Sequence, residues 1–274
     1  MSQRIAFIGA GNMAGALIAG LIADGTPATQ ILATDPSAEK CQAVAAATGI
    51  QTLQDNRAAA TQADILVLAV KPQVLKQVAS ELAATIQRRR PLVISIAAGI
   101  RSADLQGWLG GQTALVRSMP NTPAMVQTGA TVLFATPEVS AAQREQAESL
   151  LRAVGLVQWI ADESLMDVVT ALSGSGPAYY FLVMEAMQAA GQTLGLPSEV
   201  SRLLTLQTAL GAARMALESS DPPGVLRAKV TSPGGTTERA IETLEDGDIR
   251  ALLARAIDAA HKRSIELSTE LGSA

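Results

Sequence analysis

Cysteine, histidine and aromatic residues are scarce in this chain of 274 residues. Cys41 is the single cysteine, which excludes an internal disulfide framework and a cysteine-based metal cluster. His261 is the single histidine; it lies beside Lys262 and Arg263 in a helical pattern, where a solvated surface position is expected. Apolar residues make up 48% of the chain, which is ample for a core, and the abundance of alanine predicts many helices.

Long apolar runs and blocks of positive charge are also missing. No run approaches the roughly 20 apolar residues that span a bilayer, and the N-terminus enters a strand pattern without a signal segment. The net charge is −4, and the one basic triplet, Arg88-Arg89-Arg90, stands at a predicted helix end, where cations complement the helix dipole. We therefore expect a cytoplasmic protein that binds neither nucleic acid nor membranes.

The N-terminal segment combines a short apolar run with a glycine turn. Ile5–Ile8 is typical of a buried parallel strand, and Gly9-Ala10-Gly11-Asn12-Met13-Ala14 follows it and leads into a helical pattern. Gly9 permits the tight turn, Gly11 lets a pyrophosphate touch the backbone, and Ala14 stands where helix and strand pack closely. The order of strand, glycine turn and helix predicts a Rossmann-type dinucleotide-binding domain.

Asp35 follows the second predicted strand, Ile31–Thr34, at the position that reads the cofactor ribose. An acid there bonds the ribose 2′-hydroxyl and repels a 2′-phosphate, which favours NAD over NADP. Candidate donors to a 2′-phosphate nevertheless lie nearby: Thr34, Ser37, Asn56 and Arg57. Asp35 has the alternative role of capping the helix that begins near Pro36. These residues leave the choice between NAD and NADP open.

Strand-like runs alternate with helical patterns up to about residue 120. They are Ile5–Ile8, Ile31–Thr34, Ile65–Val70, Leu92–Ile96 and Ala114–Arg117. The alternation predicts an α/β fold with a doubly wound parallel sheet. Ala130–Phe134 and Leu156–Trp159 are expected to add edge strands, with a helix over 140–153 between them. We assign residues 1–162 to this dinucleotide-binding domain.

Beyond residue 163 the strand patterns stop, and helical patterns continue to the C-terminus. They cover about 163–194, 198–218, 223–230, 235–246 and 248–270, and the first is interrupted at 173–177. The helix after this interruption is apolar around most of its circumference from Tyr179 to Ala190, and such a helix must be covered on every side. We therefore expect residues 163–274 to form an all-helical domain with a dimer interface.

Three loops follow strands at the edge where ligands of doubly wound sheets bind. The first loop, Ala69-Val70-Lys71-Pro72, places a cation at this edge. The small residues of the second, Ala97-Ala98-Gly99, let the backbone approach a nicotinamide. The third loop presents Asn121 and is stiffened by two prolines. Each loop taken alone is an ordinary turn. Together, at neighbouring strand ends, they indicate the edge of a cofactor site.

A second glycine turn stands near the C-terminus, at Ser232-Pro233-Gly234-Gly235-Thr236-Thr237. A helical pattern begins there, and the first turn of a helix leaves backbone N–H groups unpaired. The glycines allow close approach of a ligand and two threonine hydroxyls lie beside them, which suits a small carboxylate. A plain helix cap is the alternative.

Six segments, spread over essentially the whole chain, resemble pyrroline-5-carboxylate reductases. They are GAGNMA at 9–14, AVKPQ at 69–73, SIAAGI at 95–100, RSMPNTPA at 117–124, SGSGPAYYF at 173–181 and VTSPGGTTERAIETLE at 230–245. The resemblance implies the reduction of 1-pyrroline-5-carboxylate to L-proline by NADPH or NADH, the final step of proline biosynthesis. Many members prefer NADPH and accept NADH, and Asp35 departs from the serine that some members carry nearby.

The resemblance also implies roles for single residues. The threonine matching Thr237 bonds the ring nitrogen and is the candidate catalytic residue. The substrate-binding candidates are Asn121, Ser232, Gly234, Gly235, Thr236 and Thr237. The cofactor-binding candidates are Gly9, Gly11, Asn12, Met13, Ala14, Thr34, Asp35, Asn56, Ala69, Val70, Lys71, Pro72, Ala97, Ala98 and Gly99. The implied assembly is an interleaved homodimer, and in some members a larger ring such as a decamer, with no metal. The active site is expected in the cleft between the domains.

Three other functions compete with this interpretation. Hydroxyacid dehydrogenases of the same two-domain plan use a lysine in a pattern like G-x-G-x-x-x-K-x-x-x-N, but Tyr180 and Met184 occupy the lysine and asparagine positions here. Coenzyme F420-dependent reductases share the N-terminal fingerprint but not the C-terminal half. A non-catalytic nucleotide sensor would not need both glycine turns.

Overall fold

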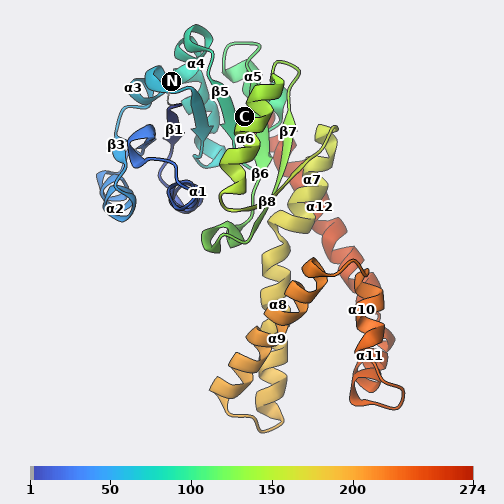
Figure 1. The fold of residues 1–274 in the computed structure, drawn as a ribbon. Helices are drawn as coiled ribbons and strands as arrows, with labels where there is room; N and C mark the ends of the chain where they lie inside the picture. The colour runs from blue at the N-terminus through green and yellow to red at the C-terminus, as the bar shows by residue number, and fades with distance from the viewer. Residues whose placement is uncertain (1–2, 274) are drawn as a thin grey trace. The chain divides into compact units, whose positions relative to one another are not determined.

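The computed structural model describes residues 3–273 and divides into two compact units (Figure 1). Unit 1 comprises Met1–Ser175 together with Ala260–Ala274, and unit 2 comprises Gly176–Ala259. The chain therefore passes between the units twice, at Ser175 and at Ala259. No helix within residues 3–273 is both long enough and apolar enough to cross a membrane.

Unit 1 is built on one sheet of eight strands in the order β3-β2-β1-β4-β5-β6-β7-β8. The strands are β1 (Ile5–Ile8), β2 (Ile31–Thr34), β3 (Gln51–Leu53), β4 (Ile65–Leu68), β5 (Leu92–Ser95), β6 (Leu115–Met119), β7 (Gly129–Ala135) and β8 (Gly155–Trp159). Strands β1 to β6 are parallel, β7 runs antiparallel to β6, and β8 is parallel to β7. The order reverses beside β1, which is the crevice where ligands of such sheets bind.

Helices cover both faces of this sheet. They are α1 (Asn12–Ala23), α2 (Ala38–Thr48), α3 (Asn56–Gln62), α4 (Pro72–Arg89), α5 (Ser102–Trp108), α6 (Ala141–Arg152), α7 (Met166–Val169) and the C-terminal part of α12 (Ile249–Ser273). Short 3-10 turns span Ala28–Gln30 (η1), Thr122–Val126 (η2) and Glu163–Leu165 (η3), and a π-helical turn spans Thr170–Gly174 (η4).

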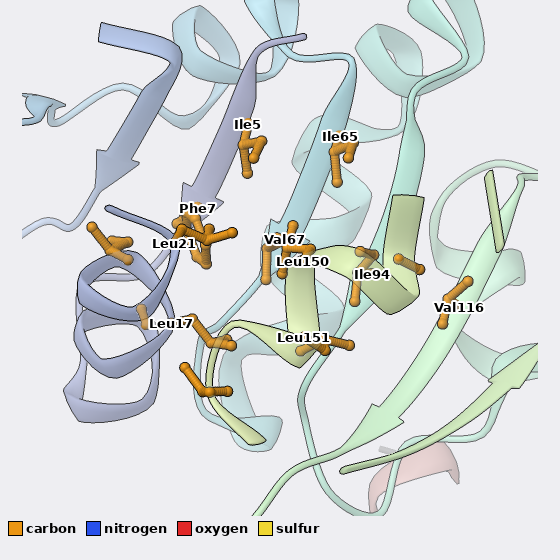
Figure 2. Packing of buried hydrophobic residues seen from close by; sticks show 14 of the residues in the cluster. Ile5, Phe7, Leu17, Leu21, Ile65, Val67, Ile94, Val116, Leu150 and Leu151 are labelled. Atoms are coloured by element: carbon orange, nitrogen blue, oxygen red, sulfur yellow. The ribbon is translucent and has the colours of Figure 1, made fainter. Parts of the chain in front are cut away.

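Alternate residues of the central strands face two hydrophobic clusters. Phe7 and Val67 pack with Leu17 of α1 and Leu150 of α6, as Figure 2 shows. Their neighbours along the strands face the opposite cluster, with residues of α3, α4 and α5. Because both faces are covered, strands β1, β2, β4 and β5 are buried over their whole length. This explains why the strands read as unbroken apolar runs in the sequence.

The predicted strands are confirmed, with four corrections. Strand β3 has no counterpart in the prediction, because Gln51-Thr52-Leu53 is short, polar and only partly buried. The strand over Ala130–Phe134 was expected at an edge, but β7 lies between β6 and β8, so β8 alone is the edge strand at that end. Strand β4 ends at Leu68, two residues early, and β6 continues to Met119.

Unit 2 consists of helices only. They are α8 (Gly176–Thr193), α9 (Ser198–Glu218), α10 (Pro223–Lys229), α11 (Thr236–Asp246) and the N-terminal part of α12. Helices α8 and α9 lie side by side (Figure 1) and approach closely at Gly191, where an added Cβ would lie 2.5 Å from Ser201 Oγ. The predicted helices are confirmed. The predicted interruption at 173–177 is shifted: the π-helical turn spans Thr170–Gly174, and α8 already begins at Gly176.

The apolar residues of unit 2 are largely exposed in the single chain. All residues of the unit are described, and only Gly176, Ser201 and Thr205 among them are buried. Tyr180 is 70% exposed, and a run of large apolar side chains on α8 and α9 is also uncovered: Phe181, Leu182, Met187, Leu203, Leu204 and Leu210. A helical unit that buries so little of its apolar surface requires cover from another molecule.

Candidate functional site

The first glycine turn is tightly enclosed by its neighbouring strand ends. Gly9 has φ +107°, and a Cβ added to it would lie 2.6 Å from the carbonyl oxygen of Ala69. Its N–H donates to the carbonyl of Thr34 at 2.8 Å. Gly9 thus sits between the ends of β2 and β4, where its conformation and the lack of space both require glycine.

Gly11, two residues further on, faces open space. It precedes α1 with φ −77°, and nothing lies within 4 Å of the position of an added Cβ. Asn12 and Met13 begin the helix, whose first N–H groups lack helical partners, while Ala14 is fully buried beneath them. An accessible helix N-terminus behind a bare glycine backbone fits a pyrophosphate.

The next two strand ends lie beside this turn. Ala69 N–H donates to Ile8 O at 2.8 Å, and Ile96 N–H donates to Leu68 O at 3.2 Å, so the ends of β1, β4 and β5 are adjacent. Val70 is half-buried, Lys71 is exposed, and Pro72 begins α4. The structure thus brings the predicted cofactor residues 9–14 and 69–72 together at one edge of the sheet.

The loop after β5 is supported by the last turns of α12. Ala97 is buried, Ala98 is half-buried, and Gly99 has φ +74°. A Cβ added to Gly99 would lie 3.3 Å from Leu271 Cδ1. This contact joins residues far apart in the chain, and the sequence contained no signal for it.

Polar residues at the end of β2 are engaged with one another. The Thr34 hydroxyl donates to Asn56 Oδ1 at 2.6 Å, and the Arg57 guanidinium donates through Nε to Glu81 O at 3.2 Å. Asp35 is 7% exposed; its oxygens accept the N–H groups of Ala10 at 3.2 Å and Ser37 at 3.0 Å.

A positively charged side chain also lies at the end of β2: Lys40 Nζ is 3.6 Å from Asp35 Oδ2. Ser37, not Asp35, is the N-cap of α2, since its side chain accepts the Lys40 N–H at 3.3 Å. The alternative of Asp35 as the cap of this helix is therefore wrong. Asp35 bonds the N–H of Ser37, before the helix begins.

Asn121 joins three parts of unit 1. Its Nδ2 donates to Ser173 O at 3.2 Å and to Ser173 Oγ at 3.3 Å, and its Oδ1 accepts the Ala130 N–H at 2.8 Å. These bonds hold the loop after β6 against β7 and the π-helical turn. Its predicted contact with substrate stays a prediction, and the observed contacts give it a positioning role.

Two partly buried clusters, each around one acidic side chain, join residues 163–167 to other parts of unit 1. Glu163 accepts hydrogen bonds from Ser102 N–H at 2.7 Å and from Arg117 at 2.9 Å, and it also accepts the Ser102 hydroxyl. One turn later, Asp167 accepts the hydroxyls of Ser264 and Ser268 on α12. Sequence reasoning assigned no role to these residues; the available signal was a charged residue, Arg117, inside a predicted buried strand.

The second glycine turn starts α11 as predicted. Gly235 is the N-cap, and Gly234 has φ +71°. Gly235 N–H donates to Ser232 O at 3.0 Å, and Gly234 N–H donates to the Glu238 carboxylate at 2.6 Å. No side chain among the described residues caps the first turn at Gly235. The N–H groups of the helix start therefore remain available, with Thr237 half-buried beside them.

Ion pairs of Glu245 hold the C-terminal end of α11. The hydrogen bond from the Arg250 guanidinium lowers the pKa of Glu245, and Arg227 adds to this effect. Arg227 donates to Glu245 at 2.9 Å, which connects α10 with α11. These contacts are solvated, so they orient the helix more than they stabilise it.

The fold and this site define a class of protein: an NAD(P)-dependent oxidoreductase with a Rossmann-type domain and a helical dimerisation domain. Residues 4–99 match the family model of NADP oxidoreductases, coenzyme F420-dependent, and residues 163–267 match the model of pyrroline-5-carboxylate reductase dimerisation. The expected oxidoreductase class, NADP-type cofactor and two-part fold are confirmed.

Relatives and solved structures identify the family. The chain is 53% identical to a pyrroline-5-carboxylate reductase of Pseudomonas aeruginosa over 99% of both chains, and 40% identical to one of Arabidopsis thaliana over 97% of this chain and 96% of that protein. A pyrroline-5-carboxylate reductase structure from Coxiella burnetii, 49% identical, superposes with a TM-score of 0.94 over 97% of this chain and 99% of that one. The chain belongs to the pyrroline-5-carboxylate reductase family.

One solved relative contains a cofactor. The pyrroline carboxylate reductase of Plasmodium falciparum with NADP bound is 29% identical, with a TM-score of 0.86 over 97% of this chain and 98% of that one. The F420-type match stops at residue 99, whereas the reductase relatives span the whole chain, which resolves the competing interpretations in favour of the reductase.

Proposed function

We propose that this chain reduces 1-pyrroline-5-carboxylate to L-proline with hydride from NAD(P)H, the final step of proline biosynthesis, with NADPH preferred and NADH as the alternative. Family membership supports the reaction. The single observation in the structure that carries the proposal is the open first turn of α11 behind Gly234 and Gly235, with a threonine hydroxyl beside it.

The N-terminal turn is suited to the cofactor, which supplies the hydride when bound. Gly11 leaves space for the pyrophosphate, and the N–H groups of Asn12 and Met13 point along the axis at the start of α1. The remaining cofactor candidates, including Val70, Lys71 and residues 97–99, surround the same edge. We propose that this edge holds the nicotinamide half.

The C-terminal turn is suited to the substrate carboxylate. Glu238 already accepts the N–H of Gly234, so the N–H groups of Thr236 and Thr237 are the donors that remain for a substrate anion. The positive end of the α11 dipole adds to this attraction. We propose that these groups, with Ser232 beside them, orient the ring.

Thr237 is proposed to bond the ring nitrogen. Hydride adds to the carbon of the protonated C=N bond, and the nitrogen becomes a secondary amine that keeps its proton. A protonated imine is already electrophilic, so the chain needs no strong acid here. Positioning of the reactants contributes most, on the order of 7–11 kcal/mol.

Replacement of Thr237 by alanine tests the proposal. A hydrogen bond to a charged group contributes about 1.5–3 kcal/mol, so we expect kcat for the imine to fall roughly ten- to hundredfold. Thr237→Ser should restore activity, and NADPH binding, measured by fluorescence titration, should stay unchanged. The matched control is Thr243→Ala on the same helix, whose hydroxyl bonds Arg239 O at 3.0 Å.

Two outcomes of this experiment would contradict the proposal. Unchanged turnover of Thr237→Ala would remove this hydroxyl from the reaction. Oxidation of NADPH by the wild type with hydroxyacid-derived keto acids, but not with 1-pyrroline-5-carboxylate, would remove the function itself. Both are read from the loss of reduced-nicotinamide absorbance.

The family match over residues 163–267 supports a dimer, and the exposed apolar side chains of α8 and α9 provide the surface for it. We further propose assembly of dimers into a larger ring such as a decamer, a cytoplasmic location, and functional domains at 1–162 and 163–274. Sedimentation equilibrium distinguishes two from ten copies of the 28.3-kDa chain.

A further inference from the structure

Asp35 is a buried acid whose carboxylate already accepts hydrogen bonds from the protein backbone. Both carboxylate oxygens accept backbone N–H groups, one from Ala10 in the glycine turn and one from Ser37 before α2. Lys40 adds a positive charge 3.6 Å away. A reader of the ribose also needs a carboxylate oxygen accessible to the 2′-hydroxyl, whereas the Asp35 side chain is only 8% exposed. The contacts therefore describe a carboxylate that connects two loops.

The charge at this edge is balanced. An unpaired carboxylate would repel a 2′-phosphate, but Lys40 offsets the charge of Asp35, and the Lys40 side chain is 58% exposed, so its ammonium remains accessible. Asn56 accepts the Thr34 hydroxyl through Oδ1, which leaves its Nδ2 amide as a donor, and the Ser37 hydroxyl proton is not used in capping α2. Arg57 lies beside them, with its Nε on Glu81 O.

We propose that Asp35 is a positioning residue that holds the glycine turn, and that Lys40 is the residue that selects NADPH by pairing with its 2′-phosphate. The inference rests on the cofactor placement proposed above. Asp35 fixes the N–H of Ala10, next to Gly9 and Gly11, and so sets the backbone that meets the pyrophosphate of either cofactor. Lys40 contributes only where a 2′-phosphate is present.

The two roles predict different binding patterns. Lys40→Met should weaken NADPH about tenfold and NADH less than twofold, because it removes the cation and leaves Asp35 to repel the phosphate. Asp35→Asn should weaken both cofactors, NADH by roughly three- to tenfold and NADPH by less, because loss of the negative charge also removes repulsion of the 2′-phosphate. Arg88→Met, an exposed residue in the last turn of α4 at the opposite end of that helix from Pro72, is the control for loss of one positive charge.

The test measures the dissociation constants for NADPH and NADH in each variant. It also measures the KM for the imine at saturating cofactor, and this KM should not change in any variant. Asp35→Glu, which keeps the charge, is measured alongside in case Asp35→Asn folds poorly; it should keep the NADPH-to-NADH ratio. Stronger NADPH binding with weaker NADH binding in Asp35→Asn would establish a ribose reader and overturn the positioning role.

Two further results would also overturn the inference. Equal losses for both cofactors in Lys40→Met would remove its selective role, and a lowered melting temperature of Asp35→Asn with unchanged cofactor affinity would leave Asp35 purely structural. Wild-type turnover of the imine remains the separate test of the proposed function, so failure of one does not imply failure of the other.

Discussion

Gly9→Ala is expected to lower activity strongly and to lower stability at the same time. The residue has φ +107°, where a side chain costs of order 1–3 kcal/mol, and its Cβ would lie 2.6 Å from Ala69 O and 2.8 Å from the carbonyl carbon. These are backbone atoms at the end of β4, so the turn has to move. A displacement of about 1 Å at a reacting centre costs on the order of a hundredfold. Cofactor titration and urea unfolding measure the two effects.

The other glycines of this segment supply matched controls. Gly11→Ala meets no atom within 4 Å and keeps an ordinary φ of −77°, so its stability should be unchanged while its methyl group obstructs the pyrophosphate and weakens both cofactors. Gly15→Ala, inside α1 and also without close neighbours, should leave the fold intact or stabilise it by up to about 1 kcal/mol. A Gly9→Ala protein as stable and active as wild type would contradict the packing described for the turn.

Glu163→Ala should cause the largest loss of stability without touching the candidate site. It removes the acceptor for the buried Arg117 guanidinium, whose side chain is only 6% exposed, and for the Ser102 N–H at the start of α5. Breaking a buried ion pair costs about 3–5 kcal/mol, and we expect the lower end because 23% of the Glu163 side chain is exposed. Urea unfolding at fixed protomer concentration measures the loss, since the dimer contributes to the apparent stability.

Substitution of both Arg117 and Glu163 provides the control for this ion pair. Arg117→Met combined with Glu163→Leu replaces both charges by apolar groups and should recover much of the stability, because no charge is left buried alone. Glu266→Ala breaks the exposed pair with Arg263 and should change little. If Glu163→Ala were as stable as Glu266→Ala, the buried pair would not hold the helical segment to the sheet.

Much of the fold follows from local patterns. Strands β1, β2, β4 and β5 are buried on both faces, so each appears as an apolar run that needs no partner to be recognised. Helix α11 begins where Gly235 and the threonines predicted it. Strand β3 escaped prediction because Gln51 and Thr52 are polar and its edge position requires no apolar run.

The features of the candidate sites were likewise only partly predictable from the sequence. Both glycine turns were predictable, because glycines directly before a helical pattern mark a turn whose backbone a ligand can approach. The partners of the polar side chains were not: Asn121 meets Ser173, and Glu163 meets both Ser102 and Arg117, across 46 to 61 residues. Those distances along the chain close only when the sheet and the helical segment have packed.

Asp35 illustrates most clearly which features the sequence determines and which depend on the tertiary structure. The amino-acid order alone determined that an acid ends the second strand and that glycines form both turns, because strand length and backbone freedom are properties of neighbouring residues. The tertiary structure alone decided that the acid bonds Ala10 and lies beside Lys40. A side chain's partner depends on which loops meet, and that is determined by the packing of the whole sheet.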